Sequence, residues 1–203
     1  MTAHPSTSSC RIAAIALTWL ALTMNADAAS EAILFDFQSS SNAAPAWQIV
    51  NDDVMGGVST SQFQIRSNGA VFSGVVSLEN NGGFASVRSS PVGQNLHGFE
   101  AFVLRARGDG RRYKFTVRTE VGFDTPLYQC TFSTRCGEWQ EHRLSFTEFV
   151  PTFRGRVLPD VAPLDPARVR SVGFLISDKQ SGPFHLEIAF IRAVRNASAG
   201  KGH

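Results

Sequence analysis

The chain has 203 residues, of which 43% are hydrophobic, 10% aromatic and 18% charged, and its formal net charge is +2. This length predicts one main domain with a sizeable core, and the 16 Phe argue against a disordered chain. So small a net charge gives no general reason to expect nucleic acid or an acidic membrane surface as a partner.

The first segment has the order of a secretory signal peptide. Arg11 precedes an apolar run of thirteen residues, 12–24, and Ala26-Asp27-Ala28 supplies a small-residue cleavage pattern. The run is short for a transmembrane helix, and it is neither Arg-rich nor amphipathic, as a mitochondrial transit peptide would be. We therefore expect a signal peptide at residues 1–28, cleavage near Ala28, export to the periplasm or the medium, and no stable membrane insertion.

After this leader, about eleven stretches alternate apolar and polar residues or form short apolar runs between turn residues. Such stretches indicate strands with one face in a core. In chain order they are residues 33–37, 47–50, 61–66, 70–78, 84–89, 102–107, 113–118, 127–132, 139–144, 169–177 and 185–190. Turn signals such as Ser67-Asn68-Gly69 and Gly108-Asp109-Gly110 separate them.

The sequence contains no convincing amphipathic helix of three turns, and helices do not alternate with the strands. This pattern predicts an all-β fold, an antiparallel β-sandwich or barrel, and a jelly roll fits the length best. The expected domain covers residues 29–195. Within it, residues 151–168 carry four prolines and are expected to form a long ordered loop, and residues 196–203 are expected to be a disordered tail.

Two cysteines, Cys130 and Cys136, remain once the leader is removed. Export would permit a disulfide between them, across a hairpin end or a bulge. Alternatively, Cys130 is buried in a strand and Cys136 is free in a turn. No CxxC or HExxH spacing occurs and the histidines are scattered, so we expect no metal and no cofactor.

Polar side chains crowd at three strand ends, in WQIVNDDVMGGVS (residues 47–59), NNGGFASVR (80–88) and SDKQSGPF (177–184). The side chains singled out in them are Asn51, Asp52, Asp53, Arg88, Asp178 and Gln180. The oxygens of the first segment suit Ca²⁺, sugar hydroxyls or the backbone amides of their own loop. We expect the fold to bring these groups together, either as a site or as a hydrogen-bonded scaffold that braces the loops.

Arginines are frequent in two successive predicted strands and the turn between them. They are Arg105, Arg107, Arg111, Arg112 and Arg118. A basic sheet face can bind phosphate or acidic partners. The aromatic residues of these strands have the opposite parity, however, so we expect no nucleic acid. No G-x-S-x-G occurs and no spacing selects a carboxylate pair for glycoside hydrolysis, so no catalytic residue and no enzyme activity are predicted.

At these clusters the sequence resembles the complex I intermediate-associated protein 30 family, which includes an assembly factor for NADH:ubiquinone oxidoreductase. The matching stretches, in the family's order, are WQIVNDDVMGGVS, GGFASVR, LRARGDGRRYKF, SFTEFVPTFRGR and GFLISDKQSGPFHLEIAFI. The resemblance implies a galactose-binding-domain-like jelly roll. The matching polar positions and glycines are Asn51, Asp52, Gly56, Gly57, Arg88, Asp178 and Gln180, and the resemblance implies no catalytic role for them.

The sequence is compatible with two alternative functions. The resemblance implies a non-enzymatic assembly factor or chaperone that holds a protein client, from a respiratory complex or the cell envelope, and that should expose an apolar patch. The leader would make this chain an exported, bacterial-type member. The alternative is an exported carbohydrate-binding module, with Trp47 as the platform for a sugar ring, although a core tryptophan at a strand start competes with that role.

Overall fold

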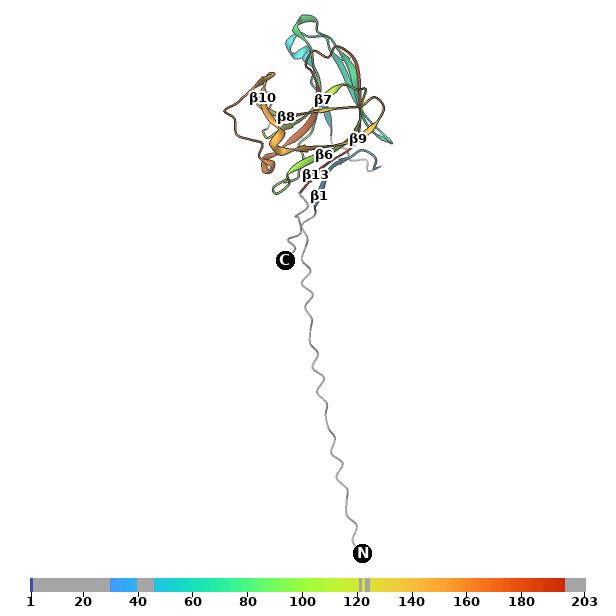
Figure 1. The fold of residues 1–203 in the computed structure, drawn as a ribbon, viewed down its shortest axis with the longest axis vertical. Helices are drawn as coiled ribbons and strands as arrows, with labels where there is room; N and C mark the ends of the chain where they lie inside the picture. Colours follow the sequence, from blue (N-terminus) through green and yellow to red (C-terminus); the bar gives the residue numbers. More distant parts are fainter. Residues whose placement is uncertain (2–29, 40–45, 121, 123–124, 196–203) are drawn as a thin grey trace.

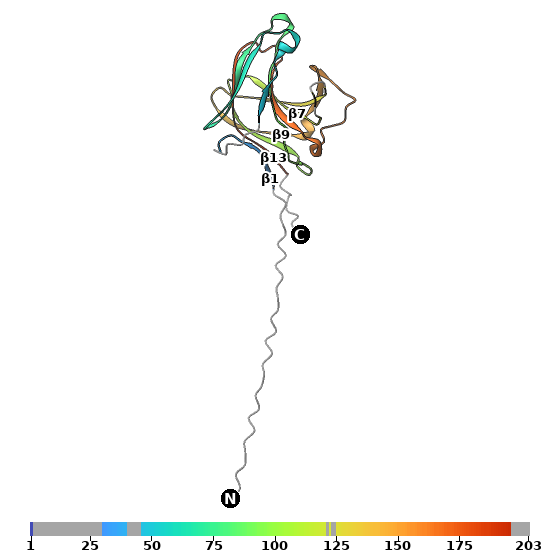
Figure 2. The same cartoon turned by 180° about the vertical axis from the view of Figure 1, so that it is seen from behind.

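The structure is a computed structural model, and it describes residues 1, 30–39, 46–120, 122 and 125–195. Beyond its first residue, the predicted leader lies outside these residues, as does the predicted tail. Two antiparallel sheets pack face to face, as Figures 1 and 2 show from opposite sides. None of the described helices is long and apolar enough to cross a membrane.

The first sheet, sheet A, has the order β3-β4-β13-β6-β9, and β1 also pairs with β13. Its strands are β1 (Glu31–Asp36), β3 (Thr60–Arg66), β4 (Gly69–Val76), β6 (Ala101–Arg107), β9 (Trp139–Ser145) and β13 (Gly182–Val194). The first part of β13 pairs with β4, and its last part lies between β1 and β6. The first and last described strands therefore lie side by side, at the bottom of Figure 1.

The second sheet, sheet B, has the order β11-β10-β8-β7-β12-β5-β2. Its strands are β2 (Trp47–Ile49), β5 (Ala85–Ser89), β7 (Arg112–Arg118), β8 (Leu127–Ser133), β10 (Val150–Phe153), β11 (Arg156–Val157) and β12 (Ser171–Ile176). Within the described part of the chain, four short 3-10 helices lie in connections: η1 (Asp52–Met55), η2 (Glu79–Asn81), η3 (Phe146–Glu148) and η4 (Pro166–Arg168).

The core lies between the sheets and is built from alternate residues of each strand. On β7, Tyr113, Phe115 and Val117 are buried, while the residues between them face outward. Phe115 contacts Phe102 of sheet A with 5.1 Å between ring centroids. Burying such a side chain contributes about 1.5–3 kcal/mol. The alternation therefore fixes which face of each strand is inside, and the predicted antiparallel β-sandwich is confirmed.

The loop predicted at residues 151–168 is partly wrong. Its first half forms the edge hairpin β10–β11, in which Arg154 and Gly155, both at positive φ, make the connection. The sequence did not suggest this turn because a non-glycine residue such as Arg154 seldom adopts positive φ. Pro151 is accommodated because β10 is near the sheet edge, where a missing N–H is tolerated.

The arginine group is divided rather than gathered on one face. Although β6 and β7 follow each other in the chain, β6 belongs to sheet A and β7 to sheet B. Arg107 pairs with Glu187 on sheet A at 2.7 Å, whereas Arg118 lies on the outer face of sheet B. The sequence cannot show which sheet each strand joins, because a turn can connect two neighbouring strands of one sheet or two strands of opposite sheets. The tertiary pairing of the strands decides between these arrangements.

Cys130 and Cys136 are both free in the structure. Cys130 is buried in β8, which continues to Ser133 before the turn that carries the exposed Cys136. Burial, with a smaller effect of the charge on Glu148, raises the pKa of Cys130 to about 11. The alternative arrangement, one buried and one free cysteine, describes this structure.

Candidate functional site

The acidic segment after β2 folds into a brace between two loops. Asp52 is fully buried, and its Oδ1 accepts a hydrogen bond from the Ser59 amide at 2.9 Å. Its Oδ2 accepts hydrogen bonds from the Ser59 hydroxyl at 2.5 Å and from the Gly83 and Phe84 amides at 2.7 and 3.2 Å. These four residues, which we call the loop brace, tie the β2–β3 loop to the β4–β5 loop.

Glycines let the chain approach this carboxylate. A Cβ atom on Gly57 would lie 2.4 Å from Asp52 Cγ, and one on Gly82 would lie 2.6 Å from Asp52 Oδ2. Both distances are shorter than van der Waals contact allows, so any larger residue would push the carboxylate out of place. One glycine of each pair, Gly57 and Gly82, is thus explained by packing around Asp52, whereas Gly56 and Gly83 have positive φ.

The electrostatics of the loop brace favour an ionised Asp52. Burial by itself raises the pKa of Asp52, but the hydrogen bonds from Ser59, Gly83 and Phe84 outweigh it and hold the pKa below its usual value. Neighbouring Asn51 is also buried, and its Oδ1 accepts from the Ser61 hydroxyl at 2.8 Å. The oxygens proposed for Ca²⁺ or a sugar are therefore engaged by the protein itself.

Asp53 is the exception in this segment, because its side chain is exposed. Nowhere in the described residues do three or more His, Cys, Asp or Glu side chains gather as a ligand set for a metal.

Asp178 and Gln180 form a second, separate brace at the β12–β13 turn. Asp178 Oδ1 pairs with Lys114 Nζ at 2.7 Å. Gln180 Oε1 accepts a hydrogen bond from the Arg112 amide at 3.1 Å, and Gln180 Nε2 donates one to the Arg112 carbonyl at 2.8 Å. The side chain of Gln180 thus pairs with the backbone of β7 as a residue of a neighbouring strand would. Burial raises the pKa of Asp178, but the hydrogen bond and charge of Lys114 outweigh it and lower the pKa.

Trp47 packs into an aromatic cluster rather than offering an open ring. Its ring is nearly parallel to Phe63 at 4.5 Å and to Phe174 at 6.3 Å, and Phe35 lies 5.1 Å away. Its Nε1 is buried and, within the described part of the chain, has no hydrogen-bond partner. The geometry therefore favours the core role of Trp47 over the sugar platform.

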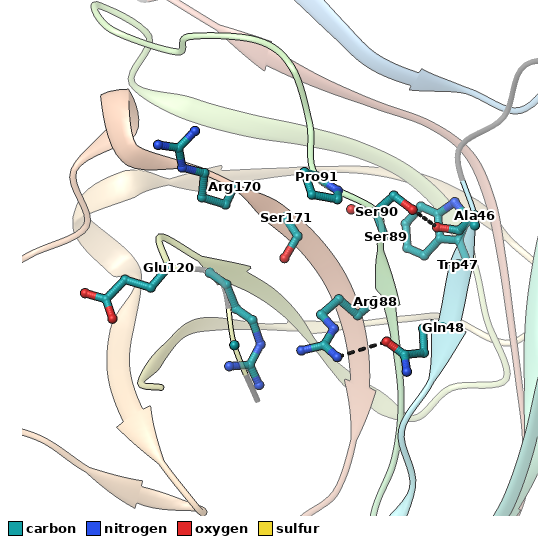
Figure 3. A pocket seen from close by; sticks show the side chains of 12 residues that line it. Ala46, Trp47, Gln48, Arg88, Ser89, Ser90, Pro91, Glu120, Arg170 and Ser171 are labelled. Carbon is teal, nitrogen blue, oxygen red and sulfur yellow. Dashed lines mark hydrogen bonds between the residues drawn. The ribbon is translucent and has the colours of Figure 1, made fainter. Parts of the chain in front are cut away.

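Arg88 lies in β5, apart from the braces, and is four residues beyond Phe84 in the chain, or about 13 Å at strand spacing. It lines a hollow of about 410 Å³ on the outer face of sheet B, which we call the basic hollow (Figure 3). The charged and hydroxyl-bearing residues around it are Arg88, Arg118, Arg170, Glu120, Ser89, Ser90 and Ser171. Arg88 Nη2 donates to Gln48 Oε1 at 3.1 Å.

Apolar side chains are exposed on the braced loops and on the adjoining end of β4, at the end of the sandwich uppermost in Figure 1, where the cyan and green segments meet. We call this surface the apolar tip; it consists of Val54, Met55, Val58, Val75 and Leu78. Val54 is 70% exposed and Met55 59% exposed. These residues were not predicted from the sequence, because the polar side chains of NDDVMGGVS indicate a polar turn. Their signal is the presence of three apolar residues within that turn.

Comparison with known proteins identifies two kinds of relative. The family model for complex I intermediate-associated protein 30 matches residues 35–188. The mitochondrial protein of that name from Mus musculus is 39% identical over 97 residues, which is 46% of this chain and 30% of that protein. The one from Drosophila melanogaster is 28% identical over 182 residues, 78% of this chain and 61% of that protein. The chain thus matches less than two thirds of the length of either relative.

Solved structures resemble the fold. The family 11 carbohydrate-binding module from Clostridium thermocellum, in complex with a β-1,3-1,4-mixed-linked tetrasaccharide, aligns with a TM-score of 0.59 at 16% identity, covering 81% of this chain and 95% of that one. The agarase AgWH50C aligns with a TM-score of 0.55 at 13% identity, over 81% of this chain and 24% of the agarase. At such identities the likeness establishes the galactose-binding-like β-sandwich alone.

Proposed function

The chain belongs to the complex I intermediate-associated protein 30 family, and we propose that it is a non-enzymatic binding protein that holds a protein client during assembly of a respiratory complex. The names of the curated relatives support the connection with complex I. The observation that carries the proposed mode of action is the apolar tip, which lies on the end of β4 and on two loops that the buried carboxylate of Asp52 ties together.

Exposed apolar side chains are ordinary when scattered, but gathered on one end they mark a surface for another protein. Covering them removes apolar area from water at about 25 cal/mol per Å². Because the loop brace already fixes both loops, binding would require little further ordering of the backbone, which lowers the entropic cost of association. The tip therefore suits an apolar segment of a client protein.

A carbohydrate ligand is the alternative. Sugar sites stack a ring on an open aromatic face. In the described residues, the exposed large hydrophobic side chains are aliphatic residues and methionines, and Trp47 is packed against Phe63. These contacts favour the protein client over the glycan.

The location of the protein is part of the proposal. We propose that residues 1–28 direct export and that cleavage occurs near Ala28, which would place the client on the outer side of the membrane or in the envelope. Amino-terminal sequencing of the mature protein from separated cell fractions tests this. A protein that starts at Met1 and remains with the cytoplasmic fraction would contradict it.

The function is tested by affinity purification of the tagged full chain from its own cells. We expect respiratory-complex subunits, or one envelope protein, to be recovered with the wild type and to be reduced about tenfold by the double change Val54→Ser and Met55→Ser. The matched control is Ile65→Ser, which alters an exposed apolar residue near the opposite end of β3. Equal recovery by both variants, or retention of the protein on a glycan matrix instead, would contradict the proposal.

A further inference from the structure

The segments that form the apolar tip carry charge of one sign. Two carboxylates border the apolar side chains: Asp53 precedes Val54 in η1, and Glu79 follows Leu78 at the start of η2. Both residues are exposed, and within the described part of the chain neither side chain forms an ion pair. Residues 50–62 and 74–85, which contain the tip, include no lysine, arginine or histidine. The rim of the tip is therefore acidic.

Basic side chains do occur on the adjoining β12–β13 turn, which leads into β13 opposite Val76 at the end of β4. Lys114 of β7 pairs there with Asp178 at 2.7 Å, so this pair adds no net charge. Lys179 is exposed on the same turn. Because Lys179 belongs to a different segment, its effect can be measured separately from that of the two carboxylates.

The backbone at both carboxylates is held in place. Asp53 directly follows Asp52, whose buried side chain is the centre of the loop brace. The Glu79 amide donates to Ser77 Oγ at 3.2 Å, and the Glu79 carbonyl accepts a hydrogen bond from the Gly82 amide at 2.8 Å. The two carboxylates therefore project from fixed backbone positions beside the apolar side chains. A fixed arrangement of charge and apolar surface favours partners with the matching arrangement.

An apolar surface with an acidic rim discriminates between possible occupants. A second copy of this chain, docked tip to tip, would bring the carboxylates of both copies together, and like charges at an interface disfavour association. An anionic lipid surface would be repelled in the same way. A polypeptide whose apolar residues adjoin a lysine or arginine would gain from both parts of the tip.

We propose that the apolar tip recognises a client segment in which an apolar stretch is flanked by lysine or arginine. The apolar residues of the client cover Val54 and Met55, and its basic side chain faces Asp53 or Glu79. This inference rests on the proposed function and names the chemistry of the client. Charges at the rim contribute chiefly to the rate and the specificity of association, and burial of the apolar side chains contributes most of the affinity.

The first test measures client recovery by the tagged full chain. We expect the double change Asp53→Asn with Glu79→Gln to reduce recovery about fivefold. Wild-type recovery should also fall more steeply than that of the double variant when sodium chloride rises from about 50 mM to about 500 mM, because salt screens exposed charges. Lys179→Gln should not reduce recovery, and a reduction would contradict the proposed sign of the client charge.

The matched control is Glu100→Gln with Asp160→Asn. This change alters the net charge by the same amount, and both residues are exposed. Neither residue belongs to the tip: Glu100 precedes β6 and its amide donates to the Val194 carbonyl at the other end of sheet A, and Asp160 follows β11. Recovery by this control should equal that of the wild type. An equal loss in both double variants would mean that net charge alone acts, and it would overturn the inference.

The second test identifies the client segment by photo-crosslinking. Met55→Cys is made in a chain that also carries Cys10→Ser and Cys136→Ser, so that the new thiol accepts a benzophenone maleimide while the buried Cys130 does not. Mass spectrometry of the crosslinked peptide should show an apolar stretch next to lysine or arginine. A peptide with an acidic flank, a lipid adduct or a peptide of this same chain would overturn the inference.

The two proposals fail in different ways. If Val54→Ser with Met55→Ser reduces recovery but the carboxylate double variant does not, the client does not read the acidic rim, and the proposed function remains. If the apolar double variant recovers as much client as the wild type, the proposed function fails and this inference fails with it. Thermal melting verifies that each variant is folded.

Discussion

The carboxylate of Asp52 and the hydroxyl of Ser59 lie 2.5 Å apart beneath the β2–β3 and β4–β5 loops. Asp52 is fully buried there, and Ser59 is 4% exposed. The Ser59 Oγ atom in turn accepts the Ser77 amide at 2.9 Å. A single serine thus links the acidic segment to the strand end that precedes the β4–β5 loop. This chain of charge-assisted hydrogen bonds gives the apolar tip its fixed shape.

Replacing Asp52 by Asn should destabilise the fold by about 2–4 kcal/mol, because the amide removes the charge and presents a donor to groups that are themselves donors. The neighbouring change Asp53→Asn is the matched control, since Asp53 is exposed, and should alter stability by less than about 0.5 kcal/mol. Urea unfolding of the three proteins measures both effects. Equal stability of the two variants would show that the brace is not important for folding.

Substitution of the glycines around Asp52 should also destabilise the fold. Gly57→Ala and Gly82→Ala each place a methyl group against the carboxylate, and we expect a loss of about 1–3 kcal/mol. Gly93→Ala is the comparison, because no atom lies within 4 Å of its added Cβ. That change should leave the melting temperature the same or slightly higher, as fewer unfolded conformations compete. A uniform response of all three variants would contradict the close packing described here.

The stability of the protein should fall as the pH drops below about 6.5, through His142. Its Nε2 is buried without a hydrogen-bond partner in the described structure, and its ring packs 4.9 Å from Phe132. Burial lowers the pKa of His142 below its ordinary value of 6.5, so the unfolded chain binds this proton more readily than the folded protein does. The free energy of unfolding is therefore greatest above pH 6.5 and decreases until the folded-state pKa is reached.

The check is the free energy of unfolding measured from pH 7.5 to pH 5. In His142→Leu the part of the slope that belongs to this residue should disappear. An identical slope in the variant and the wild type would mean that other groups carry the pH dependence.

The two cysteines should react very differently with a thiol reagent. Cys136 is exposed and should be modified quickly in the native protein at neutral pH. Cys130 is buried, with its pKa raised to about 11, and should react only after unfolding. Counting modified thiols by mass spectrometry, with Cys136→Ser as the control, measures this. A protein with no free thiol in the absence of reductant would instead contain the disulfide that the structure lacks.

The amino-acid sequence by itself determined the fold class. Along β7 the buried Tyr113, Phe115 and Val117 alternate with outward residues, and this local period reports that one face of the strand is inside. The β10–β11 hairpin was not predicted from the sequence, because its turn depends on an unusual backbone angle at Arg154 and carries no strong sequence signal. Periodicity also says nothing about which sheet a strand joins, so the separation of β6 from β7 was not foreseen.

The arrangement of the polar residues was decided by the tertiary structure alone. Asp52 binds amides 31 and 32 residues away, Gln180 pairs with Arg112, and Arg88 lies in the basic hollow with Gln48. From the sequence these side chains looked like one candidate cluster, since each follows or opens a strand with a polar turn. Hydrogen bonds between distant segments depend on how the strands pair, and that pairing is fixed by the packing of the whole core, which no local pattern contains.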